Sequence, residues 1–164
     1  DLNNDIPNLR FDYLFHTATY GQPKKFIKNK IETVKLNTET YYHLLDLAKR
    51  NKAKVLYMSS SEVYGQVPED KIPVSEEYNG NVSTLLPRAV YAESKRLAET
   101  ISKIYIDDGM DIKIIRLAIG YGPGVKFDDS RFINEFIKKH WLNNEKNLKY
   151  KDANKIRNHC YLAI

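Results

Sequence analysis

The chain has 164 residues, of which 42% are hydrophobic and 29% charged, which is typical of one globular domain and excludes a disordered or fibrous protein. It lacks the apolar run of roughly 18 residues that a transmembrane helix needs, and its first residues do not form a signal peptide. The single cysteine, Cys160, excludes an internal disulfide and suits a reducing compartment. We therefore predict a soluble, cytoplasmic protein.

The formal net charge of +5 is compatible with an anionic partner, either nucleic acid or a phosphorylated metabolite. The basic residues are scattered along the chain, and the densest group, within residues 24–30, lacks regularly spaced aromatic residues for stacking on bases. We therefore expect a solvated surface there and no nucleic-acid site. The four histidines and Cys160 do not have the spacing of metal ligands, so no metal is predicted.

The first half of the chain alternates between strand and helix patterns. Residues 11–16 are apolar and aromatic and lead into a loop of small residues at 17–21, as a buried strand does at a ligand site. A helical pattern follows over about 31–51 and ends in cations, which suit the helix dipole. Residues 54–58 then form a second buried strand, which leads into Ser59-Ser60-Ser61-Glu62.

The second half repeats this alternation after a long loop. Glycine and proline residues interrupt residues 65–88, and loops of this length are uncommon unless they are functional. A helix starting at Tyr91 is predicted to end at Asp107-Asp108-Gly109. A third strand over 111–117 and a helix over about 130–142 follow.

Buried strands separated by helices predict an α/β fold. Crossovers between parallel strands are right-handed, so the order favours a Rossmann-like, doubly wound parallel sheet with helices on both faces. Ligands of such sheets bind at the carboxyl ends of the strands. The loop of residues 17–19, the segment of residues 60–62 and the turn of residues 120–122 all fall at this edge.

Tyr91 and Lys95 lie four residues apart, so on a helix the phenol and the ammonium share one face. A phenol with a pKa of about 10 is a weak base at neutral pH, and a neighbouring cation favours the phenolate. The pair is therefore a candidate proton-transfer device. The alternative is a half-buried tyrosine beside a surface lysine, because an isolated Tyr-x-x-x-Lys often arises by chance.

Four motifs in register resemble those of the extended short-chain dehydrogenase/reductases, in their nucleotide-sugar epimerase/dehydratase branch. The resemblance covers nearly the whole chain and implies an NAD-dependent enzyme that reuses its cofactor within each turnover. The motifs are His16-Thr17-Ala18, the segment Ser59-Ser60-Ser61-Glu62-Val63-Tyr64-Gly65, the segment from Pro87-Arg88 to Tyr91-Ala92-Glu93-Ser94-Lys95, and Arg116 with Tyr121-Gly122-Pro123.

The resemblance also implies the roles of individual residues. Tyr91 would take the proton of the sugar 4-hydroxyl, Lys95 would hold the nicotinamide ribose and lower the pKa of Tyr91, and Ser60 would bond to the reacting oxygen. These roles agree with the general chemistry of the reaction, since oxidising an alcohol needs a base beside its hydroxyl group and a hydride acceptor. The predicted cofactor loop is Thr17, Ala18 and Thr19.

Ser61-Glu62 indicates the subfamily. Simple 4-epimerases of the family lack this acidic residue, 4,6-dehydratases have Asp-Glu or Ser-Glu, and UDP-glucuronate decarboxylases have Ser-Glu followed by Val-Tyr-Gly. Together with Pro87-Arg88 and residues 129–132, the pattern looks most like the decarboxylases. Those enzymes oxidise C4, release carbon dioxide from the β-keto acid and reduce the ketone again. A 4,6-dehydratase with Glu62 as the base at C5, an epimerase, a non-catalytic nucleotide-binding module and a Glu62 that is only a surface carboxylate remain alternatives.

The sequence departs from the family pattern in two places. Ile119 stands where the family usually has an asparagine that contacts the substrate diphosphate, and Arg157 lies in a segment resembling the one whose arginine binds that group. Arg131 is a second predicted substrate-binding residue. The Gly-x-x-Gly-x-x-Gly turn that holds the pyrophosphate is absent. We therefore expect residues 1–164 to be an internal fragment of a NAD-binding domain, with the substrate-binding region starting at about 120–164, and a homodimer at full length.

Overall fold

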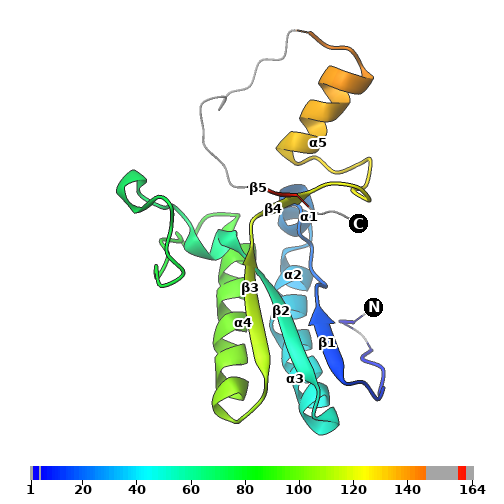
Figure 1. The fold of residues 1–164 in the computed structure, drawn as a ribbon, viewed down its shortest axis with the longest axis vertical. Helices are drawn as coiled ribbons and strands as arrows, with labels where there is room; N and C mark the ends of the chain where they lie inside the picture. The colour runs from blue at the N-terminus through cyan, green and yellow to red at the C-terminus, as the bar shows by residue number, and fades with distance from the viewer. Residues whose placement is uncertain (1, 4, 147–158, 162–164) are drawn as a thin grey trace.

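The computed structural model describes residues 2–3, 5–146 and 159–161, and its centre is a parallel sheet in the order β1-β2-β3 (Figure 1). The strands are β1 (Tyr13–His16), β2 (Lys54–Ser60) and β3 (Ile112–Leu117). The register aligns Leu14 with Val55, and Val55 with Ile112. The three strands that the sequence predicted are therefore confirmed as one sheet.

Three helices cover one face of this sheet: α2 (Lys30–Asn37), α3 (Glu39–Asn51) and α4 (Ala89–Asp107). Both crossovers run in the same direction across the strand order. Because such crossovers are right-handed, they place their helices on the same face. The described residues thus form one wound half of the Rossmann-like α/β fold.

The core lies between this face of the sheet and the helices. Tyr41 and Leu45 of α3, Tyr57 of β2 and Ala98 of α4 are all completely buried in it. The ring of His16, at the end of β1, stacks on Tyr41 with ring centres 4.8 Å apart. The core therefore reaches the carboxyl edge of the sheet, where the predicted ligand-binding segments begin.

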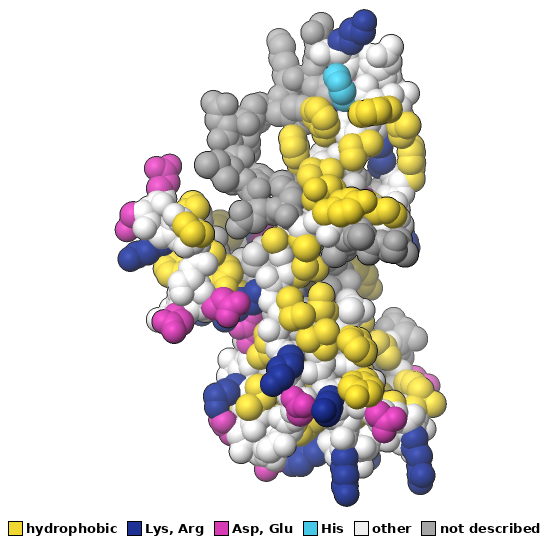
Figure 2. Space-filling view, in the orientation of Figure 1, with side chains coloured by type: hydrophobic (Ala, Val, Ile, Leu, Met, Phe, Trp, Pro, Cys, Tyr) yellow, Lys and Arg dark blue, Asp and Glu magenta, His cyan; other side chains and the backbone are white. Residues whose placement is uncertain are grey.

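The other face of the sheet carries exposed apolar side chains. Tyr13, Phe15 and Ile115 are 62%, 64% and 42% exposed. Figure 2 shows hydrophobic side chains gathered over the strands on this face. Within the described ranges no helix covers it, and a second layer would require a crossover that reverses the direction of the strand order.

The helix predicted over about 31–51 is broken. Helix α2 ends at Asn37 and α3 begins at Glu39, because Thr38 has a non-helical backbone conformation (φ −121°, ψ −76°). The completely buried Asn37 donates a hydrogen bond from Nδ2 to the hydroxyl of Ser94 on α4, 2.9 Å away. The periodicity of the sequence does not reveal this contact, since it joins residues far apart in the chain.

Several shorter elements complete the described chain. Helix α1 (Pro23–Lys28), which was not predicted, lies in the lysine-rich segment, and the 3-10 turns η1 (Ser61–Tyr64) and η2 (Glu69–Lys71) lie before α4. The predicted last helix is α5 (Phe132–Ile137), continued by a π-helical turn, η3 (Lys138–Leu142).

A separate parallel pair joins β4 (Ile119–Tyr121) to β5 (His159–Tyr161). In the described part of the chain, no helix combines the length and the apolar character needed to cross a bilayer.

Candidate active site

The predicted site residues meet where β2 ends and α4 begins. Ser60 is the last residue of β2 and caps η1, because its Oγ accepts a hydrogen bond from the amide of Glu62, 3.2 Å away. Tyr91 lies in the first turn of α4, and Ser60 is near enough to its phenol to lower the pKa of that group. The strand end thus brings Ser60, Ser61 and Glu62 to the helix that carries Tyr91.

Tyr91 is buried, with 7% of its surface exposed, and its ring stacks on Phe26 of α1 with centres 4.8 Å apart. Burial raises the pKa of Tyr91 and the charge of Glu62 raises it further, while the Ser60 hydrogen bond and the charge of Arg131 lower it. The net direction is upward, whereas we expected Lys95 to lower it. The protein's own groups therefore keep the phenol protonated at neutral pH.

Lys95 is almost completely buried one turn further along α4. Its ammonium donates a hydrogen bond to the carbonyl oxygen of Met58, 2.7 Å away, and lies 4.7 Å from the centre of the Tyr57 ring and 6.0 Å from that of Tyr91. Burial lowers the pKa of Lys95 to about 8, although Glu99 acts in the opposite direction. Lys95 therefore faces both the phenol and the strand end, and it is no surface lysine.

Glu62 pairs with an arginine at the start of the same helix. The guanidinium of Arg88 donates a hydrogen bond to Glu62 Oε1, 2.6 Å away, and lies 5.8 Å from the centre of the Phe26 ring. Since Phe26 also stacks on Tyr91, one aromatic ring connects the two groups. This ion pair directs the Glu62 carboxylate toward the start of α4.

The predicted cofactor loop directly follows β1 at the same edge. Three buried polar atoms there have no hydrogen-bond partner among the described residues: His16 Nε2, Thr19 Oγ1 and Tyr57 Oη. Buried polar atoms are rarely left unpaired. Two of these residues, His16 and Tyr57, lie near Lys95, and the unpaired atoms fit a site that receives the hydroxyl and amide groups of a bound nucleotide.

Of the two arginines predicted to bind substrate, Arg131 lies among the described residues. Arg131 forms a forked ion pair with the buried Asp129, with its Nε 2.9 Å and its Nη2 2.5 Å from Oδ2. Burial opposes ionisation, but the hydrogen bonds and charge of Arg131 hold the pKa of Asp129 below its usual value. Arg131 also acts electrostatically on Tyr91. Arg157 lies outside the described residues.

Comparisons with known proteins show the family to which the chain belongs. Residues 2–163 match the family model described as the NAD dependent epimerase/dehydratase family. The chain belongs to this family. Its members are NAD-dependent. Ile119, which was predicted to replace an asparagine typical of the family, lies in β4.

Relatives in the epimerase/dehydratase family include UDP-glucuronic acid decarboxylases. UDP-glucuronic acid decarboxylase 1 of Xenopus tropicalis is 38% identical over 140 residues, which are 83% of this chain and 33% of that protein. UDP-glucuronic acid decarboxylase 6 of Arabidopsis thaliana is 35% identical over 153 residues, 93% and 44% of the two chains. The chain thus spans less than half the length of these relatives.

Solved structures of the epimerase/dehydratase family have the same fold. The UDP-N-acetylglucosamine 4-epimerase of Methanobrevibacter ruminantium M1, in complex with UDP-N-acetylmuramic acid, is 28% identical, with a TM-score of 0.80 over 98% of this chain and 50% of that chain. The α/β fold predicted from the sequence is therefore confirmed. No cluster of three or more metal-ligating side chains occurs among the residues described.

Sequence reasoning missed several residues around this site. Glu99 and Arg96 contact the elements that carry Ser60 and Glu62, and Asn37 contacts Ser94 on α4. As a group they belong to no pattern that the sequence displays by itself. One available signal was the spacing of Glu99, since Tyr91, Lys95 and Glu99 recur at intervals of four and share one face of α4.

Proposed function

We propose that the complete protein is an NAD-dependent enzyme acting on a nucleotide sugar, and that it decarboxylates UDP-glucuronate. The observation that carries this proposal is that the end of β2, with Ser60 and Glu62, meets the start of α4, where the buried ammonium of Lys95 lies 6.0 Å from the centre of the Tyr91 ring. The Ser-Glu-Val-Tyr-Gly segment and the 38% identity to a decarboxylase support the choice of reaction.

The residues at the end of β2 and in α4 would divide the acid and base work between them. Tyr91 would act in its phenolate form and receive the proton of the sugar 4-hydroxyl, with Ser60 bonded to the same oxygen. Lys95, buried beside the phenol, would favour this phenolate before the transfer, against the burial that raises the pKa of Tyr91. Bound NAD would accept the hydride from C4 and return it in the last step.

Decarboxylation itself needs no base at C5. Once C4 is a ketone, the bond between C5 and the carboxylate breaks, carbon dioxide leaves, and the electron pair is held by the ketone until C5 is protonated. Glu62, oriented by Arg88 at 2.6 Å, would orient the sugar or the proton donor for C5. In a 4,6-dehydratase the same carboxylate would instead remove the C5 proton.

The cofactor would be held by residues that we infer from the fold. Thr17, Ala18 and Thr19 follow β1, and the buried Thr19 Oγ1 has no partner among the described side chains, which fits a hydrogen bond to a ribose or phosphate oxygen. Lys95 would hold the nicotinamide ribose. Arg131 and Arg157 are proposed contacts to the substrate, Arg131 in competition with its ion pair to Asp129.

One experiment distinguishes the reactions. The complete protein is incubated with UDP-glucuronate and NAD, and the products are identified by mass spectrometry. We expect carbon dioxide and a UDP-pentose. If UDP-glucuronate is inert and a neutral nucleotide hexose yields a 4-keto-6-deoxy sugar, the protein is a dehydratase. If a nucleotide sugar is converted only to its C4 epimer, it is an epimerase.

We also infer the organisation of the complete protein. The nucleotide-binding part would extend to about residue 120, where the substrate-binding region begins.

A homodimer is supported by the exposed apolar side chains of Tyr42 on α3 and of Leu97 and Ile104 on α4, which are 47%, 50% and 61% exposed. Light scattering on an Ile104→Lys variant of the complete protein tests this, since a dimer joined there would dissociate. The free Cys160 supports a cytoplasmic location.

A further inference from the structure

The long segment before α4 is folded into a closed loop over residues 65–81. Its neck is tied by two backbone hydrogen bonds, from the amide of Gln66 to the carbonyl of Asn81 at 2.9 Å and from the amide of Asn81 to the carbonyl of Tyr64 at 3.0 Å. Gly65 has a positive φ of 63°, and a Cβ there would lie 2.1 Å from the Asn81 oxygen. The loop begins directly after η1, the turn that carries Glu62.

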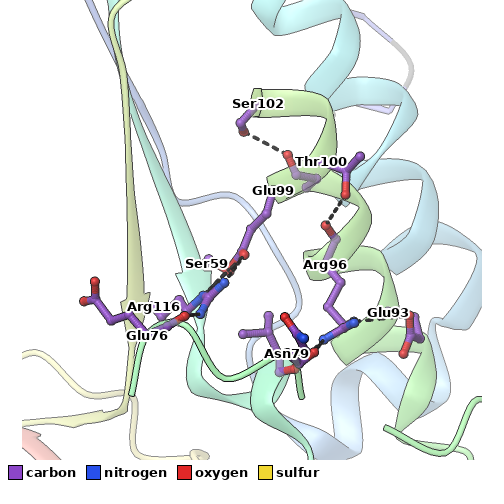
Figure 3. A network of polar contacts seen from close by, with 11 residues as sticks. Ser59, Glu76, Asn79, Glu93, Arg96, Glu99, Thr100, Ser102 and Arg116 are labelled. Atoms are coloured by element: carbon purple, nitrogen blue, oxygen red, sulfur yellow. Dashed lines mark hydrogen bonds and ion pairs between the residues drawn. The ribbon is translucent and has the colours of Figure 1, made fainter. Parts of the chain in front are cut away.

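Arg96 of α4 holds this neck from one side. Its Nη1 donates hydrogen bonds to the carbonyl of Val63, 3.0 Å away, and to the carbonyl of Asn79, 2.7 Å away. Gly80 has a φ of 86°, and a Cβ at that position would lie 2.5 Å from the same nitrogen. The segment in which the loop runs back to η1 therefore packs against the Arg96 guanidinium, which bonds to the carbonyl of Asn79 (Figure 3).

Arg116 of β3 holds the loop from the other side. Its Nη1 donates to the carbonyl of Glu76, 2.7 Å away, and its guanidinium lies 4.9 Å from the centre of the Tyr64 ring. Its Nε and Nη2 form a forked pair with Glu99, at 3.0 and 2.7 Å. Glu99 also accepts a hydrogen bond of 2.5 Å from the hydroxyl of Ser59. Arg116 therefore joins the loop to α4 and to the end of β2.

These contacts lie next to the candidate site in the chain. Arg96 follows Lys95, Val63 follows Glu62, and Ser59 precedes Ser60. The Arg116 and Glu99 side chains are only 27% and 14% exposed, so their ion pair is less screened than a surface pair and its geometry is defined by several hydrogen bonds. A side chain that holds the neighbour of a reacting group also determines where that group lies.

We propose, on the basis of the proposed function, that Arg96 and Arg116 are positioning residues that clamp the loop of residues 65–81 to α4 and thereby fix Glu62 relative to Tyr91. Neither arginine touches the reacting atoms. Arg96 sets the position of η1 through the carbonyl of Val63, and Arg116 supports the same turn through Tyr64 and the far side of the loop. Misplacing a reacting group by about 1 Å can reduce the rate about 100-fold.

The test uses the complete enzyme with Arg96→Lys, Arg96→Gln and Arg116→Gln. Lysine keeps the charge but has a single nitrogen donor group in place of the planar fork. The matched control is Lys103→Gln, which removes an exposed ion pair with Asp107 on the same helix. Hydrogen exchange of residues 61–81 is measured together with kcat and KM for the nucleotide sugar that the wild-type enzyme turns over, per site that binds NAD.

We expect faster exchange in both η1 and the loop and a fall in kcat of about 10- to 100-fold in the glutamine variants, with KM changed much less. Arg96→Lys should recover part of the rate, and Lys103→Gln should match the wild type. Gly80→Ala would place a methyl group 2.5 Å from both Arg96 Nη1 and the Val63 carbonyl oxygen, at a φ of 86°, so it should also loosen η1 and the loop without changing any charge.

Two results would overturn the proposal. One is exchange in η1 that stays at the wild-type rate in every arginine variant. The other is a loosened loop with wild-type kcat per NAD-binding site, which would mean that the arginines only stabilise the surface. Failure of the decarboxylase assignment gives a different result, because the wild-type enzyme itself then leaves UDP-glucuronate unchanged. The hydrogen-exchange measurements would still show whether Arg96 and Arg116 hold the loop of residues 65–81.

Discussion

Lys95 and Met58 are joined by a hydrogen bond of 2.7 Å from the ammonium to the backbone carbonyl. This bond links α4 to β2 two residues before Ser60. It also holds the ammonium against the aromatic ring of Tyr57, away from solvent. The lysine is therefore part of the connection that keeps the strand end against the candidate active-site helix, besides its proposed role beside Tyr91.

Replacing Tyr91 by phenylalanine in the complete enzyme should abolish turnover and leave NAD binding nearly unchanged. The substitution removes only the phenol hydroxyl, and a positioned acid or base contributes about 100- to 10,000-fold to the rate. Steady-state kinetics and calorimetric titration of NAD measure the two effects. Tyr13→Phe, on the exposed face of the sheet, is the control. Activity of Tyr91→Phe comparable to that of Tyr13→Phe would remove the phenol from the mechanism.

Replacing Glu62 by glutamine should impair a step after C4 oxidation. The amide keeps the size of the side chain but loses the charge that pairs with Arg88, so the sugar or proton donor would be misoriented. Stopped-flow absorbance should then show the reduced nicotinamide persisting on the enzyme while pentose formation slows. Glu77→Gln, an exposed carboxylate in the adjoining loop, should behave as the wild type. A Glu62→Gln enzyme that forms pentose at the normal rate contradicts the assignment.

Acid should destabilise the folded chain through His16. Burial first, and then the charge of Lys95, lower the pKa of His16 to about 4 from the ordinary 6.5. Above pH 6.5 the histidine is neutral in both the folded and unfolded states. Below it only the unfolded chain takes up the proton, so the free energy of unfolding falls by about 3 kcal/mol between pH 6.5 and 4.

Urea unfolding of the 164-residue chain across this range measures the loss due to His16. His16→Phe keeps an aromatic ring between Tyr41 and Tyr57 and should flatten the pH dependence. His43→Phe, at an exposed position of α3, should not. Equal slopes for the wild type and His16→Phe would show that other groups cause the acid sensitivity.

The 164-residue chain by itself should bind NAD weakly. It contains no Gly-x-x-Gly-x-x-Gly turn, so the backbone amides that such a turn directs at a pyrophosphate are absent from it. Calorimetric titration is expected to give a dissociation constant well above the micromolar range. Micromolar affinity would mean that the loop after β1, with the buried hydroxyl oxygen of Thr19, supplies a phosphate site of its own.

The sequence by itself determined the strands and most of the helices. Apolar runs before small or polar residues placed the ends of β1, β2 and β3, because buried parallel strands are continuous apolar segments. The interval of four between Tyr91 and Lys95 placed both side chains on one face of α4. These features depend on the chain's local periodicity, so the arrangement of Ser60, Glu62 and Tyr91 at one edge of the sheet could be anticipated.

Only the tertiary structure decided how these groups are held. Asn37 ends its helix to reach Ser94, Lys95 bonds to Met58, and Arg116 pairs with Glu99 across seventeen positions of the chain. It also raised the pKa of Tyr91, where the sequence predicted a lower value, because burial outweighs the opposing effects of Ser60 and Arg131. Each of these outcomes depends on which distant segments exclude water from a side chain, and local periodicity carries no information about the path of the loops that bring those segments together.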